Sequence, residues 1–160
     1  MIDDLAMRAS LTGAAFLLLA TGLSVNGLLG ADRVREAALG LATHIARAID
    51  DVASLRGAVI VRAGIGASIP LPPTVAGSSY TILLRANSVV VSATSATSAV
   101  GLRTPVHPFP PIQGAFTAKE IRELDQGIVE TGPGRGFIVE NRSVLVDGEP
   151  NLLTFLTLPP

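Results

Sequence analysis

The feature that most constrains this chain is a run of 23 residues without a charge, residues 9–31, between Arg8 and Asp32. As a helix the run would measure about 35 Å. The hydrocarbon core of a bilayer is about 30 Å thick, so a helix of this length would cross it. A segment this apolar gains by leaving water, in lipid or among other apolar surfaces. We therefore expect the protein to be anchored in a membrane or assembled into a larger object.

This run can be interpreted as a cleaved signal peptide or as a retained helix. A signal peptide joins a positively charged start to an apolar core of about 7–15 residues. Here the apolar run is longer, and Asp3 and Asp4 precede it. An amphipathic pattern also follows it without interruption, so we expect a retained helix. Positive residues flank both ends (Arg8 before, Arg33 and Arg35 after), so the charge pattern does not orient the helix in a membrane.

Residues 32–56 predict the amphipathic continuation of this helix. Apolar residues recur there at spacings of three and four, which is typical of one buried helix face. No proline interrupts residues 1–56, and Gly57 is a suitable stop. We therefore expect one helix over residues 1–56, bent near Asn26-Gly27 or Gly30, whose second half lies on a sheet. The apolar stripe consists of Val34, Ala38, Leu41, Ile45, Ile49, Val52 and Leu55.

From Gly57 onward the hydrophobic period changes to two, which indicates strands. Turns at Ala86-Asn87 and Asp147-Gly148 predict two hairpins. The small-residue repeat at 93–98 predicts a turn or an edge, and the proline-rich stretch at 104–114 predicts an extended crossing. The expected strands are 58–62, 65–71, 79–85, 88–92, 99–103, 137–140, 143–146 and 152–158.

One short helix is expected late in this β-rich part. Thr117 and Glu120 have the spacing of a capping box, Phe116 and Ile121 that of a hydrophobic staple, and Gly127 follows the helix. The predicted fold class is therefore α+β. A hydrophobic helical stalk (1–56) precedes a small, sandwich-like β head (57–160) with one short helix.

Composition excludes several kinds of function. The net charge is −1, without a basic stripe, so we expect no binding to nucleic acid. The absence of cysteine excludes disulfides, thiolate metal sites and cysteine nucleophiles. His44 and His107 lack metal-ligand spacing and are expected on the surface, so we predict no metal site.

The remaining polar motifs are interpreted as structural. The acidic clusters Asp50-Asp51 and Glu120/Glu123/Asp125 lack the alternation of a calcium loop and are expected on solvated helix faces. The glycine-rich stretch 131–136 could cradle an anion, but no strand–loop–helix pattern surrounds it, so a loop is expected. No Gly-x-Ser-x-Gly occurs. We expect no enzymatic activity, no cofactor and no small-molecule substrate.

Asn141-Arg142-Ser143 is a sequon for N-glycosylation, which makes Asn141 a candidate glycan site in a turn between strands. The apolar run also contains Thr12, Thr21, Ser24 and Asn26 among small residues. Such residues favour helices packed against helices. A single-pass anchor in lipid is the alternative.

The plan of a long apolar helix that becomes amphipathic and leads into a small β-rich head resembles the type IV pilin-like superfamily, especially archaeal pilins and archaellins. The head segments that carry the resemblance are SIPLPPTVAGSSYTILLR at 68–85 and SVVV at 88–91. The resemblance implies a filament whose core is a bundle of N-terminal helices and whose heads, often glycosylated, form the outer surface. Such a filament serves adhesion or motility.

The sequence therefore predicts a structural subunit of a cell-surface filament that passes through a membrane-embedded stage and polymerises with copies of itself. The alternative is a single-pass membrane protein whose extracytoplasmic β domain is an accessory or binding component of a surface appendage. A membrane-tethered enzyme is a third hypothesis. The expected polymerisation residues are Phe16, Leu17, Leu18, Leu19, Leu23, Val25, Leu28, Leu29, Val34, Leu41, Ile45, Ile49 and Val52.

Overall fold

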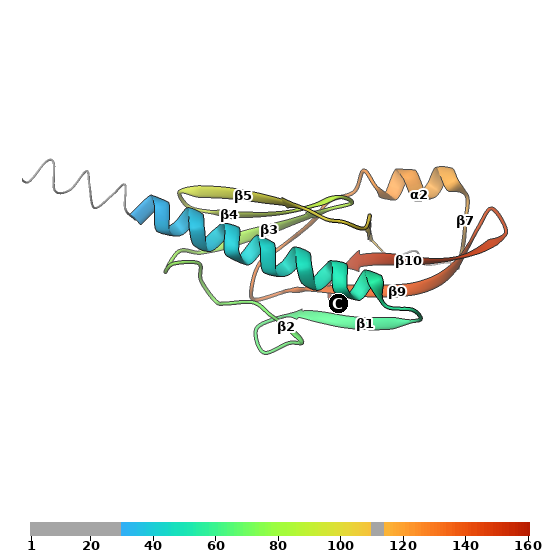
Figure 1. Cartoon of the computed structure of the whole chain (residues 1–160), viewed down its shortest axis with the longest axis horizontal. Coiled ribbons are helices and arrows are strands. Elements are labelled where there is room, and N and C mark those ends of the chain that lie inside the picture. Colours follow the sequence, from blue (N-terminus) through green and yellow to red (C-terminus); the bar gives the residue numbers. More distant parts are fainter. Residues whose placement is uncertain (1–29, 110–113) are drawn as a thin grey trace, which may run out of the picture. The chain divides into compact units, whose positions relative to one another are not determined.

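The computed structural model describes residues 30–109 and 114–160. The chain divides into two compact units, Met1–Arg33 and Val34–Pro160, and the description below concerns the second. This unit contains most of a long helix, two β-sheets and one short helix, which confirms the α+β class (Figure 1). The predicted boundary at residues 56 and 57 thus falls inside one packed unit, between the helix and the sheets.

The long helix covers residues 30–54 among those described. Its end is close to the expected stop, because Leu55 N–H still donates to the Val52 carbonyl (3.1 Å) and Gly57 takes a left-handed φ of 112°. The apolar stripe faces inward as its spacing predicts. Leu55 is the exception, since it follows the helix and is 47% exposed. Ala42 and Ala46 are buried in addition to the predicted Val34, Ala38, Leu41, Ile45, Ile49 and Val52.

The four-stranded sheet has the order β5-β4-β3-β8. The predicted hairpin is confirmed, since Arg85 pairs with Ser88 across Ala86-Asn87. The small-residue repeat at 93–98 was expected to form a turn or an edge, with a separate strand at 99–103. The repeat contains a turn and then the start of edge strand β5. Strand β8 was not expected. The strands are β3 (Tyr80–Arg85), β4 (Ser88–Ala93), β5 (Ala96–Gly101) and β8 (Val129–Thr131).

The six-stranded sheet has the order β2-β1-β9-β10-β6, and β7 also pairs with β9. The two short strands expected at 137–140 and 143–146 are one continuous strand. The strand expected at 65–71 is wrong in extent, because a turn occupies its first half, where Gly66 has a φ of 72°. The strands are β1 (Val59–Gly64), β2 (Ile69–Pro70), β6 (His107–Pro108), β7 (Ala115–Phe116), β9 (Phe137–Val146) and β10 (Glu149–Thr157).

Two glycines are required by the backbone of this sheet. Asp147 and Gly148 both have positive φ (50° and 85°), which is the two-residue turn that suits the twist of a hairpin. Gly136, at a φ of 69°, precedes β9, and a Cβ there would overlap the carbonyl oxygen of Ala63. The backbone of β1 therefore approaches this loop more closely than any side chain allows.

The short helix α2 (Ala118–Leu124) begins at the predicted capping box. Thr117 Oγ1 accepts from Glu120 N–H (3.2 Å), and the Glu120 carboxylate accepts from Thr117 N–H (2.7 Å). These hydrogen bonds to the backbone and the hydroxyl of Thr117 lower the pKa of Glu120. In Figure 1, α2 lies beside β7.

One hydrophobic core joins the long helix to both sheets. The four-stranded sheet contributes Tyr80, Ile82, Leu84, Val89, Val91 and Val129, and the six-stranded sheet contributes Ala63, Ile69, Phe137, Val139 and Leu156. Val106, from the crossing between the sheets, is also fully buried. Small aliphatic side chains thus build most of this core.

Candidate functional site

The long helix was the predicted site of assembly. In its described part, the apolar face packs against the sheets of the same subunit. Val34, Leu41, Ile45, Ile49 and Val52 are buried within the unit itself. These five residues attach the helix to its own sheets, and little of their surface is left for contacts between copies. The other predicted residues lie outside the described part of the chain: Phe16, Leu17, Leu18, Leu19, Leu23, Val25, Leu28 and Leu29.

A buried polar group holds the end of this helix. Asn141, in the middle of β9 and 1% exposed, donates through Nδ2 to the carbonyls of Val52 (2.6 Å) and Leu55 (3.1 Å). Its Oδ1 accepts from Thr154 Oγ1 (2.7 Å), on β10. The last carbonyls of a helix have no partner within the helix. Asn141 therefore caps the helix from the sheet and satisfies its own amide at the same time.

This burial corrects the prediction of a glycan site in a turn. Asn141 lies inside a strand, where its main chain pairs with Val59 and with Thr154. The Nδ2 atom that a glycan would modify already donates two hydrogen bonds. A glycan on Nδ2 would replace one of its two hydrogens and so remove at least one of these bonds, and it would have to occupy space that the folded head fills.

A second polar contact ties the helix to the four-stranded sheet. The Asp50 carboxylate accepts from the backbone N–H groups of Arg103 (2.9 Å) and Thr104 (3.2 Å), in the segment after β5. Nearer the start of the helix, Ser98 Oγ donates to the Arg35 carbonyl (3.3 Å). Asp50 was expected on a solvated helix face, and it is half-buried there, with its carboxylate bound to the backbone of the neighbouring segment. An acidic group near the end of a helix is unfavourable for the helix dipole, and these two N–H groups compensate it.

Beyond the helix end, the face of the β9–β10 hairpin that carries Asn141 and Thr154 also carries exposed leucines. Leu145 is 45% exposed and Leu152 is 44% exposed, while Leu55, just after the helix, is 47% exposed. We call these three residues the leucine patch. The strand prediction missed this patch because it did not assign faces. The Asp147-Gly148 turn could have done so, since its two-residue loop places Leu145 opposite Pro150 and Ser143 opposite Leu152.

His107 corrects a further prediction, because it is buried where a surface residue was expected. Its Nδ1 lies 2.6 Å from Asp125 Oδ1, and its ring lies 5.7 Å from the ring of Phe155. The distance of 2.6 Å is that of a hydrogen bond between the ring and the carboxyl group. The pair fastens β6 to the end of α2.

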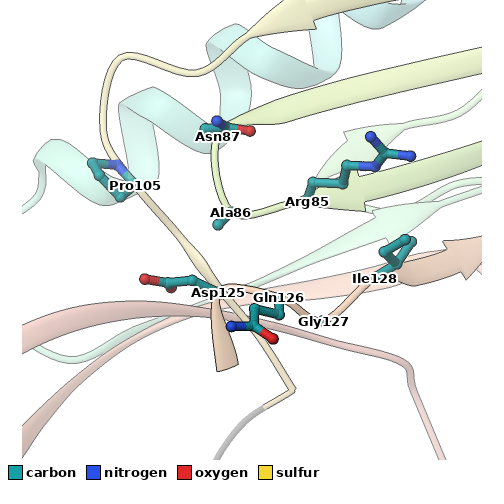
Figure 2. Close-up of a pocket in the computed structure, with 8 residues that line it drawn as sticks. All are labelled: Arg85, Ala86, Asn87, Pro105, Asp125, Gln126, Gly127 and Ile128. Carbon is teal, nitrogen blue, oxygen red and sulfur yellow. The ribbon is translucent and has the colours of Figure 1, made fainter. Parts of the chain in front are cut away.

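An open pocket of about 610 Å³ lies beside this pair, between the β3–β4 turn and the end of α2 (Figure 2). Residues 102–106, which include the lining residue Pro105, are held against the β3–β4 turn by two hydrogen bonds. Leu102 N–H donates to the Asn87 carbonyl (2.9 Å), and Val106 N–H donates to the Ala86 carbonyl (2.8 Å). In Figure 2, the side chains of Arg85 and Asp125 point away from each other. The lining residues are Arg85, Ala86, Asn87, Pro105, Asp125, Gln126, Gly127 and Ile128.

The glycine-rich stretch 131–136 closes on itself. Thr131 Oγ1 donates to the Gly136 carbonyl (2.6 Å), and Gly136 N–H donates to the Gly132 carbonyl (2.9 Å). These contacts use groups that an anion would otherwise recruit, and they set Gly136 against β1. The stretch is therefore a structural loop, as predicted.

Comparisons with protein-family models, with curated proteins and with solved structures give no match to this chain. The arrangement itself, a helix packed against a β-sheet head, is consistent with a pilin-like fold. Within residues 30–109 and 114–160, no helix has both the length and the hydrophobicity to span a membrane. The same residues contain no group of three or more acidic, histidine or cysteine side chains placed to hold a metal ion.

Proposed function

We propose that this protein is the structural subunit of a pilus-like cell-surface filament, which polymerises through its N-terminal helix with the β head outward. One observation carries the proposal. The apolar stripe of the helix from Val34 to Val52 is already buried in the head, so it has no free apolar face to offer. The uncharged run of residues 9–31, which leads into this helix, therefore needs another surface to leave water.

The composition of that run supports association between copies. Burying one leucine side chain contributes about 1.5–3 kcal/mol. Association of two molecules costs about 4–15 kcal/mol in lost freedom of motion. A few buried leucines therefore offset this cost, and the run contains Leu17, Leu18, Leu19, Leu23, Leu28 and Leu29. Before assembly, the same run would reside in the membrane.

The test compares matched leucine-to-aspartate variants of the full chain. Leu18→Asp and Leu28→Asp place a charge in the uncharged run, whereas Leu39→Asp places one at an exposed position of the described helix. After detergent removal, negative-stain microscopy and sedimentation should find filaments for the parent chain and for Leu39→Asp, and none for the other two. If Leu18→Asp and Leu28→Asp polymerise like the parent chain, the proposal fails.

The alternative is a membrane-anchored domain that binds a partner of a surface appendage, and the open pocket favours it. This pocket offers a guanidinium, a carboxylate and two amides, from Arg85, Asp125, Asn87 and Gln126. A full chain that stays monomeric in detergent-free buffer or in vesicles, and that loses binding to a captured appendage protein in the Arg85→Ala variant, would support this alternative over the filament.

A further inference from the structure

We propose that the leucine patch (Leu55, Leu145, Leu152) is the docking surface for the uncharged segment of a second copy of this chain, residues 9–29. The inference rests on the proposed function and deepens it, because it names the surface of one subunit that receives the helix of the next. It is argued from the register of the hairpin, from the rigidity of its tip and from the position of the helix end.

The register of β9 and β10 places the patch on the helix side of the six-stranded sheet. Opposite residues of an antiparallel pair point to the same face, and every second residue follows them. Asn141 and Thr154 are opposite each other and contact the helix end. Two and four residues further along β9, Ser143 and Leu145 therefore lie on that same face, as do Leu152 and Pro150 on β10.

The patch continues an interface that already exists within the subunit. The long helix covers this face as far as Asn141 and ends there, and Leu55 is the first residue beyond it. Past this point the face consists of Ser143, Leu145, Pro150 and Leu152, none of which is charged. A sheet face that binds one apolar helix and then continues uncovered and apolar is suited to a second apolar helix.

The tip of the hairpin is held in place rather than free. Leu145 N–H donates to the Gly114 carbonyl (2.9 Å), and Asp147 N–H donates to the Phe116 carbonyl (2.8 Å). The Asp147 carboxylate also accepts from Ala118 N–H at the start of α2 (3.3 Å). The two strand leucines are thus presented on a fixed surface, which lowers the cost of ordering on binding.

The position of the patch favours a segment from another copy over the subunit's own. The subunit's own uncharged segment joins the long helix at its start, residue 30, and Leu55 follows the other end, about 37 Å further along the helix axis. Residues 9–29 would measure about 30 Å as a helix, so the subunit's own segment would not reach the patch, whereas the segment of a second copy is free of this limit. Each copy then has one segment and one patch, a head-to-tail contact that repeats into a filament.

Photo-cross-linking of assembled full-length chain tests this contact directly. A benzophenone amino acid replaces Leu152, and the matched control replaces Ile60, which is exposed on the opposite face of the sheet. Filaments are grown from equal parts of isotope-labelled and unlabelled chain, irradiated and digested with trypsin. Arg8 and Arg33 bound a single tryptic peptide, residues 9–33, so the acceptor can be identified by mass.

The expected product joins the probe at position 152 to peptide 9–33 of a differently labelled copy, and the probe at position 60 gives no such product. Cross-links from position 152 to any other peptide, or within one copy only, would overturn the inference. If the filaments form and depend on Leu18 and Leu28 while position 152 links elsewhere, the docking surface is wrong and the proposed function stands. If no filaments form, both are wrong.

Substitutions give a second, independent measurement. Leu145→Asp combined with Leu152→Asp should raise the critical concentration for assembly by about tenfold or more, since two leucines lose their apolar contact. Ile60→Asp should leave it within about twofold, because an isolated exposed apolar residue makes no such contact. Equal critical concentrations in the two variants would also contradict the proposal.

Discussion

On one face of the six-stranded sheet, a buried stretch is polar and the stretch next to it, which is exposed, is apolar. This is the reverse of the usual relation between burial and polarity. Under the helix end, the face of β9 and β10 presents Asn141 and Thr154, which are polar and buried. A few residues toward the hairpin tip, the same face presents Leu145 and Leu152, which are apolar and exposed. Polar residues are therefore inside where a helix end needs hydrogen-bond donors, and apolar residues are outside where no element of the described chain covers them.

The comparison teaches that the polarity of each stretch matches the segment that covers it or is proposed to cover it. The carbonyls of Val52 and Leu55 accept from a side chain of the sheet, so the covered stretch must provide a donor. The uncovered stretch provides only apolar contact, which is suited to a partner whose backbone is already satisfied, such as an uncharged helix. The predictions below test the covered stretch first and the uncovered stretch last.

Gly136→Ala should have the largest effect on stability, because the new Cβ would overlap the Ala63 carbonyl and force β1 away from the start of β9. We expect a loss of about 4 kcal/mol or more in unfolding free energy, or failure to fold. Gly134→Ala in the same loop is the control, since its Cβ would meet nothing within 4 Å. Urea denaturation followed by circular dichroism measures both, and equal midpoints would contradict the close approach.

Asn141→Ala should come next, because it leaves two helix carbonyls and the Thr154 hydroxyl without their shared partner. We expect a loss of about 2–4 kcal/mol, since buried polar groups without partners cost about 1–3 kcal/mol each. The matched control is Asn151→Ala, an exposed asparagine of the same hairpin, with an expected change within about 0.5 kcal/mol. Equal unfolding midpoints for the two variants would show that the cap does not stabilise the helix end.

The Tyr80→Phe variant removes one buried hydroxyl and leaves the ring in place, so it tests how much that hydroxyl contributes to stability. It is the single tyrosine, is buried in the core and donates to the Pro72 carbonyl (2.6 Å). Burial raises the pKa of Tyr80 to about 12. Because the pKa of the folded state exceeds the unfolded value of about 10, the tyrosine contribution is complete below pH 10 and is lost as the pH rises toward 12.

The stability of the parent chain should therefore fall more steeply between pH 10 and pH 12 than that of Tyr80→Phe. At neutral pH the variant should lose only about 1 kcal/mol, the net value of one hydrogen bond. Absorbance at the phenolate band gives the titration directly, since no other tyrosine contributes. A midpoint near 10 in the folded protein would show that the hydroxyl is open to water.

The smallest effect on stability is expected in the uncovered stretch. Leu145→Ser and Leu152→Ser should each change the unfolding free energy of the dissociated chain by no more than about 0.5 kcal/mol, because exposed positions contribute little to folding. A loss of about 2 kcal/mol or more, as for a buried leucine, would mean that the patch is part of the core of the subunit and is not available to a partner.

Local patterns predicted much of this fold. The Ala86-Asn87 and Asp147-Gly148 turns, the capping box at Thr117 and the apolar stripe of the helix all depend on residues a few positions apart. The short strands β2, β6 and β8 depend on pairing with distant segments, as when His107 and Pro108 align beside Phe155 and Leu156. No local period marks strands of two or three residues.

The polar residues were misjudged for the same reason. Asn141 is separated from Val52 by 89 positions, and Asp50 from Arg103 by 53. His107 pairs with Asp125 across the end of α2. Each of these residues is of a type usually found at the surface, and only a distant partner explains the polar contact that it makes. The uncharged run of residues 9–31 was evident at once, and its proposed role in assembly awaits measurement.

The most direct test of this account is a helical reconstruction by electron cryo-microscopy of material assembled from the full chain. The account predicts a filament with residues 9–29 at its centre, the β heads outside, and the segment of one copy against Leu145 and Leu152 of another. A protein that remains a single copy in solution after detergent removal, or a polymer held together by its heads with residues 9–29 outside the core, would contradict it.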